Sequence, residues 1–365
     1  MSQSTVDPAS FTCPAPLKPT ERIVLGHGSG GRLSAELLRD VFLPLFSNPV
    51  LDRLDDQAIV EIGGVRVAFT TDSFVVKPLF FPGGDIGSLA VHGTVNDLAM
   101  GGAKPVFLSA GFILEEGFPT ADLRRIAASM ARAASAAGVA IVTGDTKVVE
   151  KGKGDGLFMN TTGIGIVPEG VRLSANRARP GDRVILSGSI GDHGIAILAQ
   201  REGLEFETEI VSDSAALHGL VQAMLAASLD VSAETSGAIR CLRDPTRGGL
   251  SSTLNEIAAQ SLVSIQIEEA AIPVHDQVRG ACELLGLDPL YVANEGKLVA
   301  IVAPEAADCI LAAMRRDPLG ADAAVIGTVG GTIGNRRAGT VTMKSVFGST
   351  RIVDLLAGDQ LPRIC

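Results

Sequence analysis

Long apolar runs and dense clusters of basic residues are both missing from this sequence. Its longest apolar stretches, such as residues 139–142 and 298–303, are far shorter than the roughly 20 residues of a membrane-spanning helix. Acidic residues outnumber basic ones by 41 to 31, which gives a formal net charge of -10. Nucleic-acid binding normally needs a basic surface. We therefore expect neither a membrane nor a nucleic acid as a partner.

Paired metal-binding motifs and a secretory signal are missing as well. The five cysteines are widely scattered, with no C-x-x-C pair and no Cys/His group at zinc-site spacing, so neither a disulfide framework nor a structural zinc is expected. The first residues show no basic region followed by an apolar one, and the expected location is the cytoplasm. Cys365 stands apart from the other cysteines because it is the last residue.

The composition favours two domains over one very large core, because the chain has 365 residues, 46% hydrophobic residues and 42 glycines. Residues 1–20 contain four prolines and little apolar periodicity, which predicts a flexible leader. The pattern of strands and helices breaks at residues 168–180. We therefore predict an N-terminal ATP-binding and dimerisation domain at 21–168, a second domain at 169–345, and a mobile tail at 346–365.

Several local elements follow from periodicity and turn residues. Residues 59–70 read as two strands around the Gly63-Gly64 turn, and residues 85–100 read as a helix that ends at glycine. A second helix is predicted over 121–137. A strand over 139–143 and a loop over 144–147 follow it.

A glycine-rich segment near the start is the first candidate binding site. Its small residues would allow backbone N–H groups to approach phosphate oxygens, with an arginine adding positive charge. The segment comprises His27, Gly28, Ser29, Gly30, Gly31 and Arg32. The alternative is a flexible turn, because its spacing matches neither the Walker A motif nor the Rossmann motif.

Carboxylates at the ends of predicted elements form the second candidate site. Magnesium prefers oxygen ligands, and aspartates that converge from separate strands could hold it against a triphosphate. Taken singly, each residue is better explained as a turn or cap residue, and it is their joint occurrence after apolar strands that favours a metal site. The set comprises Asp55, Asp56, Asp72, Asp97, Asp145 and Asp244.

Four segments resemble the aminoimidazole ribonucleotide synthetase superfamily: Asp55-Asp56-x-Ala, Thr71-Asp72, residues 96–105 (N-D-L-A-M-G-G-A-K-P) and Gly144-Asp145-Thr146. The resemblance covers about residues 22–345 and implies a two-lobed α+β fold, a homodimer and the use of ATP. It also implies that Asp56, Asp72, Asp97, Asp145 and Asp244 hold Mg²⁺. By the same resemblance, the glycine-rich segment binds ATP together with Thr71, Asn96, Gly144 and Thr146.

Within that superfamily the chain resembles the HypE family of carbamoyl dehydratases, on three features: residues 27–31 (H-G-S-G-G), 293–297 (A-N-E-G-K) and 362–365 (P-R-I-C). The resemblance implies that a carbamoyltransferase (HypF-like) loads a carbamoyl group onto Cys365. ATP-dependent dehydration then yields a thiocyanate. The cyanide goes to iron of the [NiFe]-hydrogenase centre on a HypC–HypD-like complex. Lys147 and Glu295 are implied as catalytic residues.

Two other readings remain open from the sequence. One is another ATP-dependent enzyme of the superfamily, either selenophosphate synthetase-like or kinase-like; the other is a non-catalytic cysteine carrier. Residues 26–32 lack the cysteine and lysine of selenophosphate synthetases, and a kinase has no need of a terminal cysteine. A carrier, in turn, has no need of dispersed aspartates around a glycine-rich loop.

Overall fold

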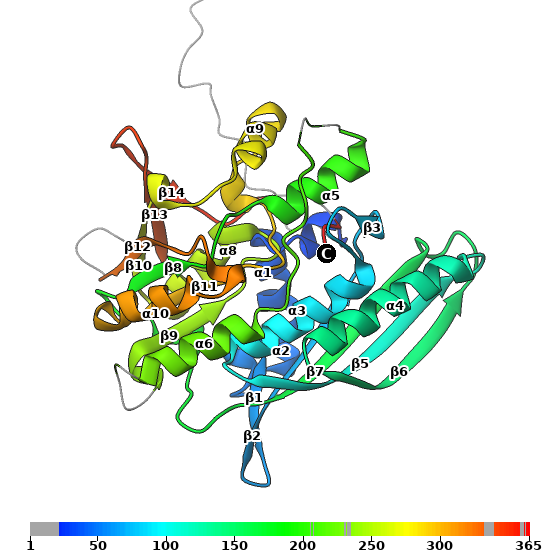
Figure 1. Cartoon of the computed structure of the whole chain (residues 1–365), viewed down its shortest axis with the longest axis horizontal. Helices are drawn as coiled ribbons and strands as arrows, with labels where there is room; N and C mark the ends of the chain where they lie inside the picture. Colours follow the sequence, from blue (N-terminus) through cyan, green and yellow to red (C-terminus); the bar gives the residue numbers. More distant parts are fainter. Residues whose placement is uncertain are drawn as a thin grey trace, which may run out of the picture.

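A mixed five-stranded sheet and two long helices form the first lobe (Figure 1). The computed structural model describes residues 22–204, 206, 208–229, 231, 235–331, 339–357, 361 and 363–365. Neighbouring strands are antiparallel except for the parallel pair β5–β6. In spatial order the strands are β1 (Ala58–Ile62), β2 (Val65–Phe74), β7 (Leu157–Ile166), β5 (Lys104–Glu115) and β6 (Ala140–Val149). The predicted α+β fold is confirmed.

The predicted hairpin and helices of this lobe are confirmed. Gly63 and Gly64 join β1 to β2 with φ angles of 59° and 81°, which only glycine adopts at low cost. Helix α3 (Ile86–Met100) begins after Asp85, whose carboxylate accepts hydrogen bonds from two backbone amides of the first turn. Helix α4 (Thr120–Ala136) packs beside it, and both cover one face of the sheet (Figure 1).

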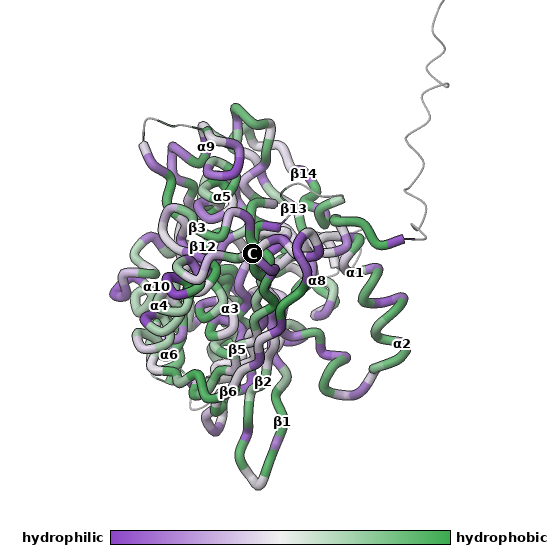
Figure 2. The backbone as a smooth tube through the Cα atoms, turned by 90° about the vertical axis from the view of Figure 1, so that its right-hand side faces the viewer, coloured by the Kyte–Doolittle hydropathy of each residue, from purple (hydrophilic) through white to green (hydrophobic). Residues whose placement is uncertain are grey.

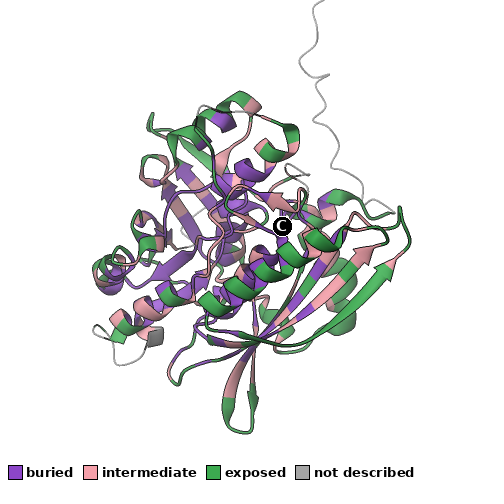
Figure 3. Cartoon of the chain, turned by 45° about the vertical axis from the view of Figure 1, so that its right-hand side comes forward, coloured by how far each residue is buried: buried purple, intermediate pink, exposed green. Residues whose placement is uncertain are grey.

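The other face of this sheet carries exposed apolar side chains. Register pairs Phe69 with Ile164 and Ile164 with Phe107, so these three share one face, and each is about two-fifths exposed. Strand β6 is exposed along nearly its whole length at the edge of the sheet (Figure 3). The sequence predicted a loop over 144–147, which is wrong, because β6 continues without a break to Val149. An edge strand and an apolar sheet face are features that proteins normally cover.

A seven-stranded sheet forms the second lobe. In spatial order its strands are β14 (Thr350–Val353), β13 (Thr340–Lys344), β10 (Ser264–Glu268), β12 (Ala324–Gly330), β8 (Arg183–Leu186), β11 (Val299–Val302) and β9 (Ile239–Arg243). A small separate hairpin pairs β3 (Phe80–Phe81) with β4 (Gly84–Asp85).

Helices cover both faces of the second sheet, which explains its almost continuous burial. Ile185 packs with α6 and α10, whereas its neighbours Val184 and Leu186 pack with α8, as the alternation of strand side chains requires. The helices are α5 (Asp192–Glu202), α6 (His218–Leu229), α7 (Thr235–Ala238), α8 (Gly249–Gln260), α9 (Asp276–Leu285) and α10 (Ala307–Met314).

Short helices complete the described chain. A projecting arm before β1 contains η2 (Leu25–Gly28), α1 (Arg32–Leu37), η3 (Leu38–Phe42), α2 (Leu43–Phe46) and η4 (Leu51–Arg53) (Figure 2). The second lobe adds η5 (Ala175–Arg177), η6 (Glu269–Ala271), η7 (Pro289–Tyr291), η8 (Pro304–Ala306) and η9 (Pro318–Gly320). None of the helices in the described ranges combines the length and the apolar character needed to cross a membrane.

Within the described part of the C-terminal segment, one strand and the last residues are packed, although the sequence predicted a mobile tail over 346–365. Its strand β14 pairs antiparallel with β13, and Val353 is fully buried. Ile364 and Cys365 are also buried, 3% and 9% exposed, and they belong to the core cluster of the first lobe. Few residues follow β14, so their packing gave no periodic pattern to read. The predicted leader lies outside the described residues.

Candidate functional site

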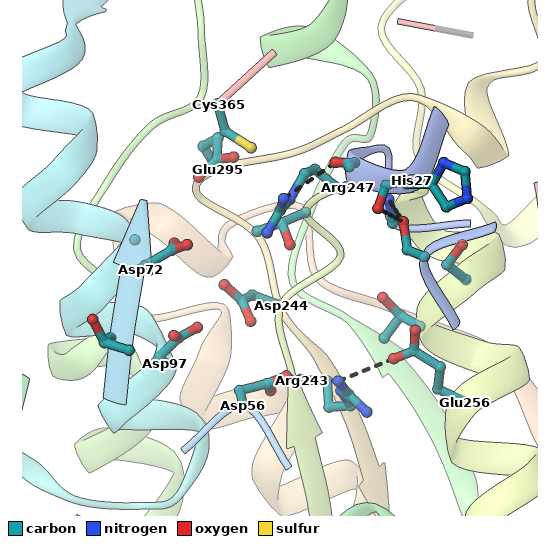
Figure 4. Close-up of a pocket in the computed structure, with 18 residues that line it drawn as sticks. His27, Asp56, Asp72, Asp97, Arg243, Asp244, Arg247, Glu256, Glu295 and Cys365 are labelled. Atoms are coloured by element: carbon teal, nitrogen blue, oxygen red, sulfur yellow. Dashed lines mark hydrogen bonds and ion pairs between the residues drawn. The ribbon is translucent and has the colours of Figure 1, made fainter. Parts of the chain in front are cut away.

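A cleft of about 350 Å³ lies where the two lobes meet, and Cys365 is part of its wall (Figure 4). Both lobes, the glycine-rich segment and the end of the chain contribute to its lining. The lining residues are His27, Gly28, Gly30, Ser34, Asp56, Thr71, Asp72, Gly93, Asp97, Arg243, Asp244, Thr246, Arg247, Ser252, Thr253, Glu256, Glu295 and Cys365.

Three carboxylates of the cleft come from the first lobe. Asp56 precedes β1, Asp72 lies within β2, and Asp97 lies near the end of α3. The Thr70 hydroxyl lies 2.8 Å from Asp97 Oδ2 and 3.0 Å from the Asp56 carbonyl oxygen, so it ties two of these segments together. A hairpin strand and a buried helix thus hold the carboxylates on one side of the cleft.

The end of β9 supplies a fourth carboxylate and an ion-pair network. Asp244 directly follows this strand and is buried. Arg243 beside it contacts Asp56 at 2.8 Å and Glu256 at 3.0 Å. Figure 4 shows Asp56, Asp72, Asp97 and Asp244 around a common space, with Arg243 at its lower edge. One guanidinium thus balances part of a strongly acidic site.

The glycine-rich segment packs against the loop between β9 and α8. Gly30 has a φ of 73°, and a Cβ atom there would lie 2.5 Å from the Arg247 carbonyl oxygen. Gly248 has a φ of 81°, and a Cβ atom there would lie 2.7 Å from the Gly30 carbonyl oxygen. Arg247 Nη1 donates to the Gly28 carbonyl oxygen at 3.2 Å. Glycine is therefore required on both sides of this close approach.

Glu295 is held at the junction of the lobes by backbone contacts. Its amide donates to Asp213 Oδ1 at 3.0 Å, and its carbonyl oxygen accepts from Asn96 Nδ2 at 3.3 Å. The Glu295 side chain is 3% exposed, and its Oε1 atom is buried with no hydrogen-bond partner among the described residues. A buried, unpartnered carboxylate oxygen aimed at a cleft is suited to a ligand.

Cys365 lines this cleft because several groups bind the backbone of the last residues of the chain. The Val75 amide donates to the Cys365 carbonyl oxygen at 3.0 Å, and the Lys77 amide donates to the Arg363 carbonyl oxygen at 3.3 Å. His193 Nε2 lies 2.9 Å from the carbonyl oxygen of Ile364. The segment therefore runs beside residues 75–77, much as an added strand would.

The side chain of Arg363 also holds the last residues of the chain in place. Its guanidinium pairs with Asp155 and donates to the Val75 carbonyl oxygen at 3.0 Å. Lys77 Nζ contacts Asp155 at 3.0 Å, and Arg201 donates to the Arg363 carbonyl oxygen at 2.8 Å. We call Arg363, Asp155, Lys77 and Arg201 the tail latch.

Burial shifts the ionisation of nearly every acid in the cleft. Desolvation raises the pKa of Asp56 to about 6 and that of Asp244 to about 8. Burial, followed by repulsion from Asp244 and Asp72, raises the pKa of Asp97 and of Glu295 well above the ordinary range. Without a cation, burial therefore favours the protonated forms of these acids.

Burial also raises the pKa of the Cys365 thiol, against the opposing attraction of Arg247. A thiol is a nucleophile only as the thiolate. Burial in the docked position therefore disfavours the thiolate, which is the reactive form of Cys365.

The carboxylates of the cleft suit Mg²⁺ that is bound together with a phosphate-bearing ligand, although they do not form a complete coordination shell by themselves. No three His, Cys, Asp or Glu side chains in the described part of the chain converge closely enough to hold a metal ion. The acids surround an open space instead, and Asp56 Oδ2 is buried without a partner. Mg²⁺ usually takes only one or two carboxylates and completes its shell with water and phosphate oxygens.

The structure brings most of the predicted residues together, but not all of them. Arg32 pairs with Asp354 at 2.8 Å outside the cleft, and a Cβ atom at Gly31 would lie 2.5 Å from the Leu356 carbonyl oxygen. Ser29 lines a smaller neighbouring cavity. Asn96 is buried and bonds the second lobe, so it acts as a link between lobes within this chain.

The predicted motif at residues 144–147 lies outside this chain's cleft. Gly144, Asp145, Thr146 and Lys147 all belong to the edge strand β6. Lys147 Nζ contacts Asp145 at 2.5 Å, and both side chains are two-thirds exposed. Asp145 shares the exposed sheet face with Asn160 through their common partner Gly111.

Sequence reasoning missed several residues that line the cleft, among them both of its arginines. Arg243 and Arg247 flank Asp244 within the segment R-D-P-T-R-G-G that drew attention to the aspartate, so a signal was present. The remaining missed residues are Ser34, Gly93, Thr246, Ser252, Thr253 and Glu256, which carried no distinctive pattern.

Comparisons with known proteins agree with this geometry. The AIR synthase related protein N-terminal domain matches residues 54–167, and the corresponding C-terminal domain matches residues 179–336. The carbamoyl dehydratase HypE of Azotobacter vinelandii is 61% identical over 339 residues, which cover 93% of this chain and 96% of that protein.

Two solved structures are similar over most of the chain. The hydrogenase maturation protein HypE in complex with ATP has a TM-score of 0.77 and 51% identity, covering 94% of this chain and all of that one. HypE in a complex with HypF has a TM-score of 0.80 and 48% identity, covering 88% and 99%.

Proposed function

Because this chain belongs to the HypE family of carbamoyl dehydratases, within the AIR synthase related proteins, we propose that it dehydrates a carbamoyl group carried on its own Cys365. The product is a thiocyanate, whose cyanide serves [NiFe]-hydrogenase maturation. The observation that carries this proposal is the position of Cys365 in a cleft lined by buried carboxylates. A terminal cysteine with no chemical role would have no reason to lie there.

The glycine-rich segment and the acidic cleft support ATP as the second substrate. Backbone groups around Gly28 and Gly30 line the cleft opposite the carboxylates, and a solved HypE structure contains ATP. Mg²⁺ bound with ATP would neutralise phosphate oxygens and favour the ionised forms of the cleft carboxyl groups. We propose Asp56, Asp72, Asp97 and Asp244 as the residues that hold it.

The reaction balances with ATP as the acceptor of one oxygen. The carbamoyl oxygen attacks the γ-phosphorus of ATP, the bond to ADP breaks, and the carbamoyl carbon then carries a phosphate leaving group. Loss of the N–H protons and cleavage of the C–O bond give the C≡N group and free phosphate. The net change is S–CO–NH₂ plus ATP to S–C≡N plus ADP and phosphate.

Glu295 is the best placed group to take an N–H proton. It lines the same cleft as Cys365, and its pKa is raised by burial and by the nearby acids, which makes its carboxylate a stronger base. Asn96 and Asp213 fix the backbone on either side of it. Arg247 lies between Cys365 and the glycine-rich segment, where it would neutralise a developing negative charge (Figure 4).

We propose that the tail leaves the cleft to receive the carbamoyl group. In the docked state the thiol is buried, which disfavours its thiolate, so a donor enzyme could neither reach nor use it. A solved complex joins HypE to HypF, which supports a HypF-like carbamoyltransferase as the donor. A HypC–HypD-like complex is the proposed acceptor of the cyanide.

A homodimer explains the exposed sheet face and the position of residues 144–147. Thr71 lines the cleft yet shares the exposed sheet face with Thr162. Asp145 lies three strands away on that face, about 14 Å across the sheet at about 4.8 Å per strand. That separation is too large for one phosphate site in one chain. We propose that pairing of two sheets brings Asp145 and Lys147 to the partner's cleft.

Oxygen tracing tests this chemistry directly. Protein carbamoylated with an ¹⁸O-labelled group is mixed with unlabelled ATP and Mg²⁺, and the phosphate released is analysed by mass spectrometry. The proposal requires one ¹⁸O atom per phosphate, in a 1:1 ratio to thiocyanate. Unlabelled phosphate formed alongside thiocyanate would exclude phosphorylation of the carbamoyl oxygen.

A further inference from the structure

A second cavity, separate from the acidic cleft, is lined by arginines. It has a volume of about 250 Å³ and lies between the β1–β2 hairpin and the linker that precedes β8. Arg53 and Arg66 belong to the first lobe, and Arg172 and Arg177 belong to the linker. No residue of this cavity lines the cleft that contains Cys365.

These four guanidinium groups have no acidic partner among the residues that the structure describes. Within the described ranges none of them forms an ion pair with a carboxylate, and the Nε atom of Arg177 is buried without a hydrogen-bond partner. Arg66 donates only to backbone, at 2.6 Å to the Val171 carbonyl oxygen and at 3.4 Å to that of Pro168.

The nearest carboxylates do not compensate this charge. Asp55 accepts from the hydroxyl of Ser174, which lines the cavity, at 2.9 Å and from the Ala175 amide at 3.0 Å, and among the described residues it forms no ion pair with the four arginines. Glu61 faces Arg66 across the hairpin but is exposed and forms no ion pair with it. Four like charges around one small cavity repel one another, and burial lowers the pKa of Arg66 and of Arg177.

We propose that this cavity binds a small phosphate-class anion. Guanidinium groups pair with phosphate through parallel N–H donors, which fits an arginine-lined pocket better than a single point charge would. Typical pockets for drug-sized ligands start at about 300 Å³, so this cavity suits inorganic phosphate, pyrophosphate or one phosphate group of a larger molecule. We name it the arginine cavity.

Because the arginine cavity lies between the first lobe and the linker, a bound anion would affect the junction between the lobes. The arginine cavity joins the hairpin of the first lobe to the linker, and Asp55, which bonds that linker, is followed directly by the cleft residue Asp56. An anion that draws Arg53 and Arg66 toward Arg172 and Arg177 would tighten the junction between lobes.

Titration calorimetry with inorganic pyrophosphate tests the proposal on the full-length protein. The protein is first freed of divalent cations with EDTA and then exchanged into EDTA-free buffer of constant ionic strength, because without a divalent cation the acidic cleft repels polyanions. Wild type is compared with R66Q/R177Q and with the exposed pair R53Q/R172Q, which guards against a folding defect. A control of equal charge, R124Q/R132Q, carries its changes on the exposed surface of α4.

Saturable 1:1 binding is expected for wild type and for the control, with at least tenfold weaker binding in R66Q/R177Q and a clear loss in R53Q/R172Q. Absence of saturable binding to wild type, or equal binding by all four proteins, would overturn the proposal. Citrate and a hexaglutamate peptide are titrated in parallel. Binding of either one without binding of pyrophosphate would also overturn it, because the cavity would then recognise carboxylates.

Discussion

The amide of Val75 donates a hydrogen bond of 3.0 Å to the carbonyl oxygen of Cys365, so the last residue of the chain is anchored to the segment that follows β2. Asp72 lies three residues before Val75 and lines the same cleft as Cys365. One strand end thus positions both a proposed magnesium ligand and the proposed carrier thiol. This geometry supports the proposal that the docked tail is a working state of the site.

Loosening the tail latch should expose Cys365. In Asp155→Asn, Arg363 and Lys77 lose their carboxylate partner, and about 1.4 kcal/mol of lost charge-assisted bonding would make the undocked state about tenfold more populated. Cys365 should react about tenfold faster with iodoacetamide, measured on the C-terminal peptide by mass spectrometry. Glu116→Gln, an exposed acid on the same lobe, is the matched control. Equal rates in both variants would mean that Asp155 does not hold the tail.

Mixed dimers should reveal whether Asp145 acts across the subunit interface. Asp72→Asn and Asp145→Asn homodimers are both expected to lose ATP-dependent dehydration. If Asp145 serves the partner's cleft, a heterodimer of the two variants contains one intact site and should recover about half the activity per dimer. A heterodimer as inactive as its parents would mean that Asp72 and Asp145 of the same chain serve one cleft. A monomeric, fully active wild type in light scattering would remove the dimer altogether.

Binding of magnesium and ATP should release protons. The pKa values of Asp56 and Asp244 are raised to about 6 and about 8 in the empty cleft, and a bound cation favours the ionised forms. Affinity should therefore increase as the pH rises from about 6 to about 8. Calorimetry in buffers of different ionisation enthalpy should show net proton release at pH 7. Zero release at every pH would mean that the cation does not bind near these acids.

The same acids set the pH dependence of stability. Their pKa values are higher in the folded protein than in the unfolded chain, so the folded state binds more protons between about pH 4 and pH 8. Burial lowers the pKa of His92, of His193 and of His218, which opposes this effect below about pH 6.5. Without a bound cation, the free energy of unfolding should therefore fall as the pH rises from about 7 to about 8. Magnesium and ATP should reduce the slope in urea titrations; an unchanged slope would contradict the assignment.

Asn96 should stabilise the junction of the lobes. Its side chain bonds the carbonyl oxygens of Ala215 and Glu295 and the amide of Leu217, all in the second lobe. Asn96→Ala leaves these buried groups without a partner and should lower the free energy of unfolding by about 2–4 kcal/mol. Asn48→Ala, which loses only exposed local bonds, should cost about 1 kcal/mol or less. Equal losses would contradict the linking role.

Sequence reasoning found the parts of this molecule that local chemistry specifies. The Gly63-Gly64 hairpin and the helix that ends at Met100 follow from turn and capping residues, and both are confirmed. The aspartates at 56, 72, 97 and 244 were grouped by their positions at element ends, and they do line one cleft. What the sequence could not supply was the side of the sheet on which each residue lies.

Asp145 illustrates that limit. A one-residue change in register moves a side chain to the other face of a sheet, and the continuation of β6 through residues 144–147 places Asp145 on the exposed face. The docked position of Ile364 and Cys365 could not be predicted from the sequence either, because it depends on single contacts with His193 and Val75, which lie in distant segments of the chain. Arg243 and Arg247 were visible beside Asp244, yet their roles follow only from tertiary contacts.

Intact mass of wild type and Cys365→Ala, each incubated with the carbamoyl donor enzyme, carbamoyl phosphate and ATP, tests the central claim most directly. The Cys365→Ala substitution should leave folding and ATP binding nearly unchanged, because it removes only one thiol group at the end of the chain. Wild type should gain one carbamoyl group and then lose one water when ATP and Mg²⁺ are available, while the variant should gain nothing. A carbamoyl adduct of equal yield on Cys365→Ala would contradict the account.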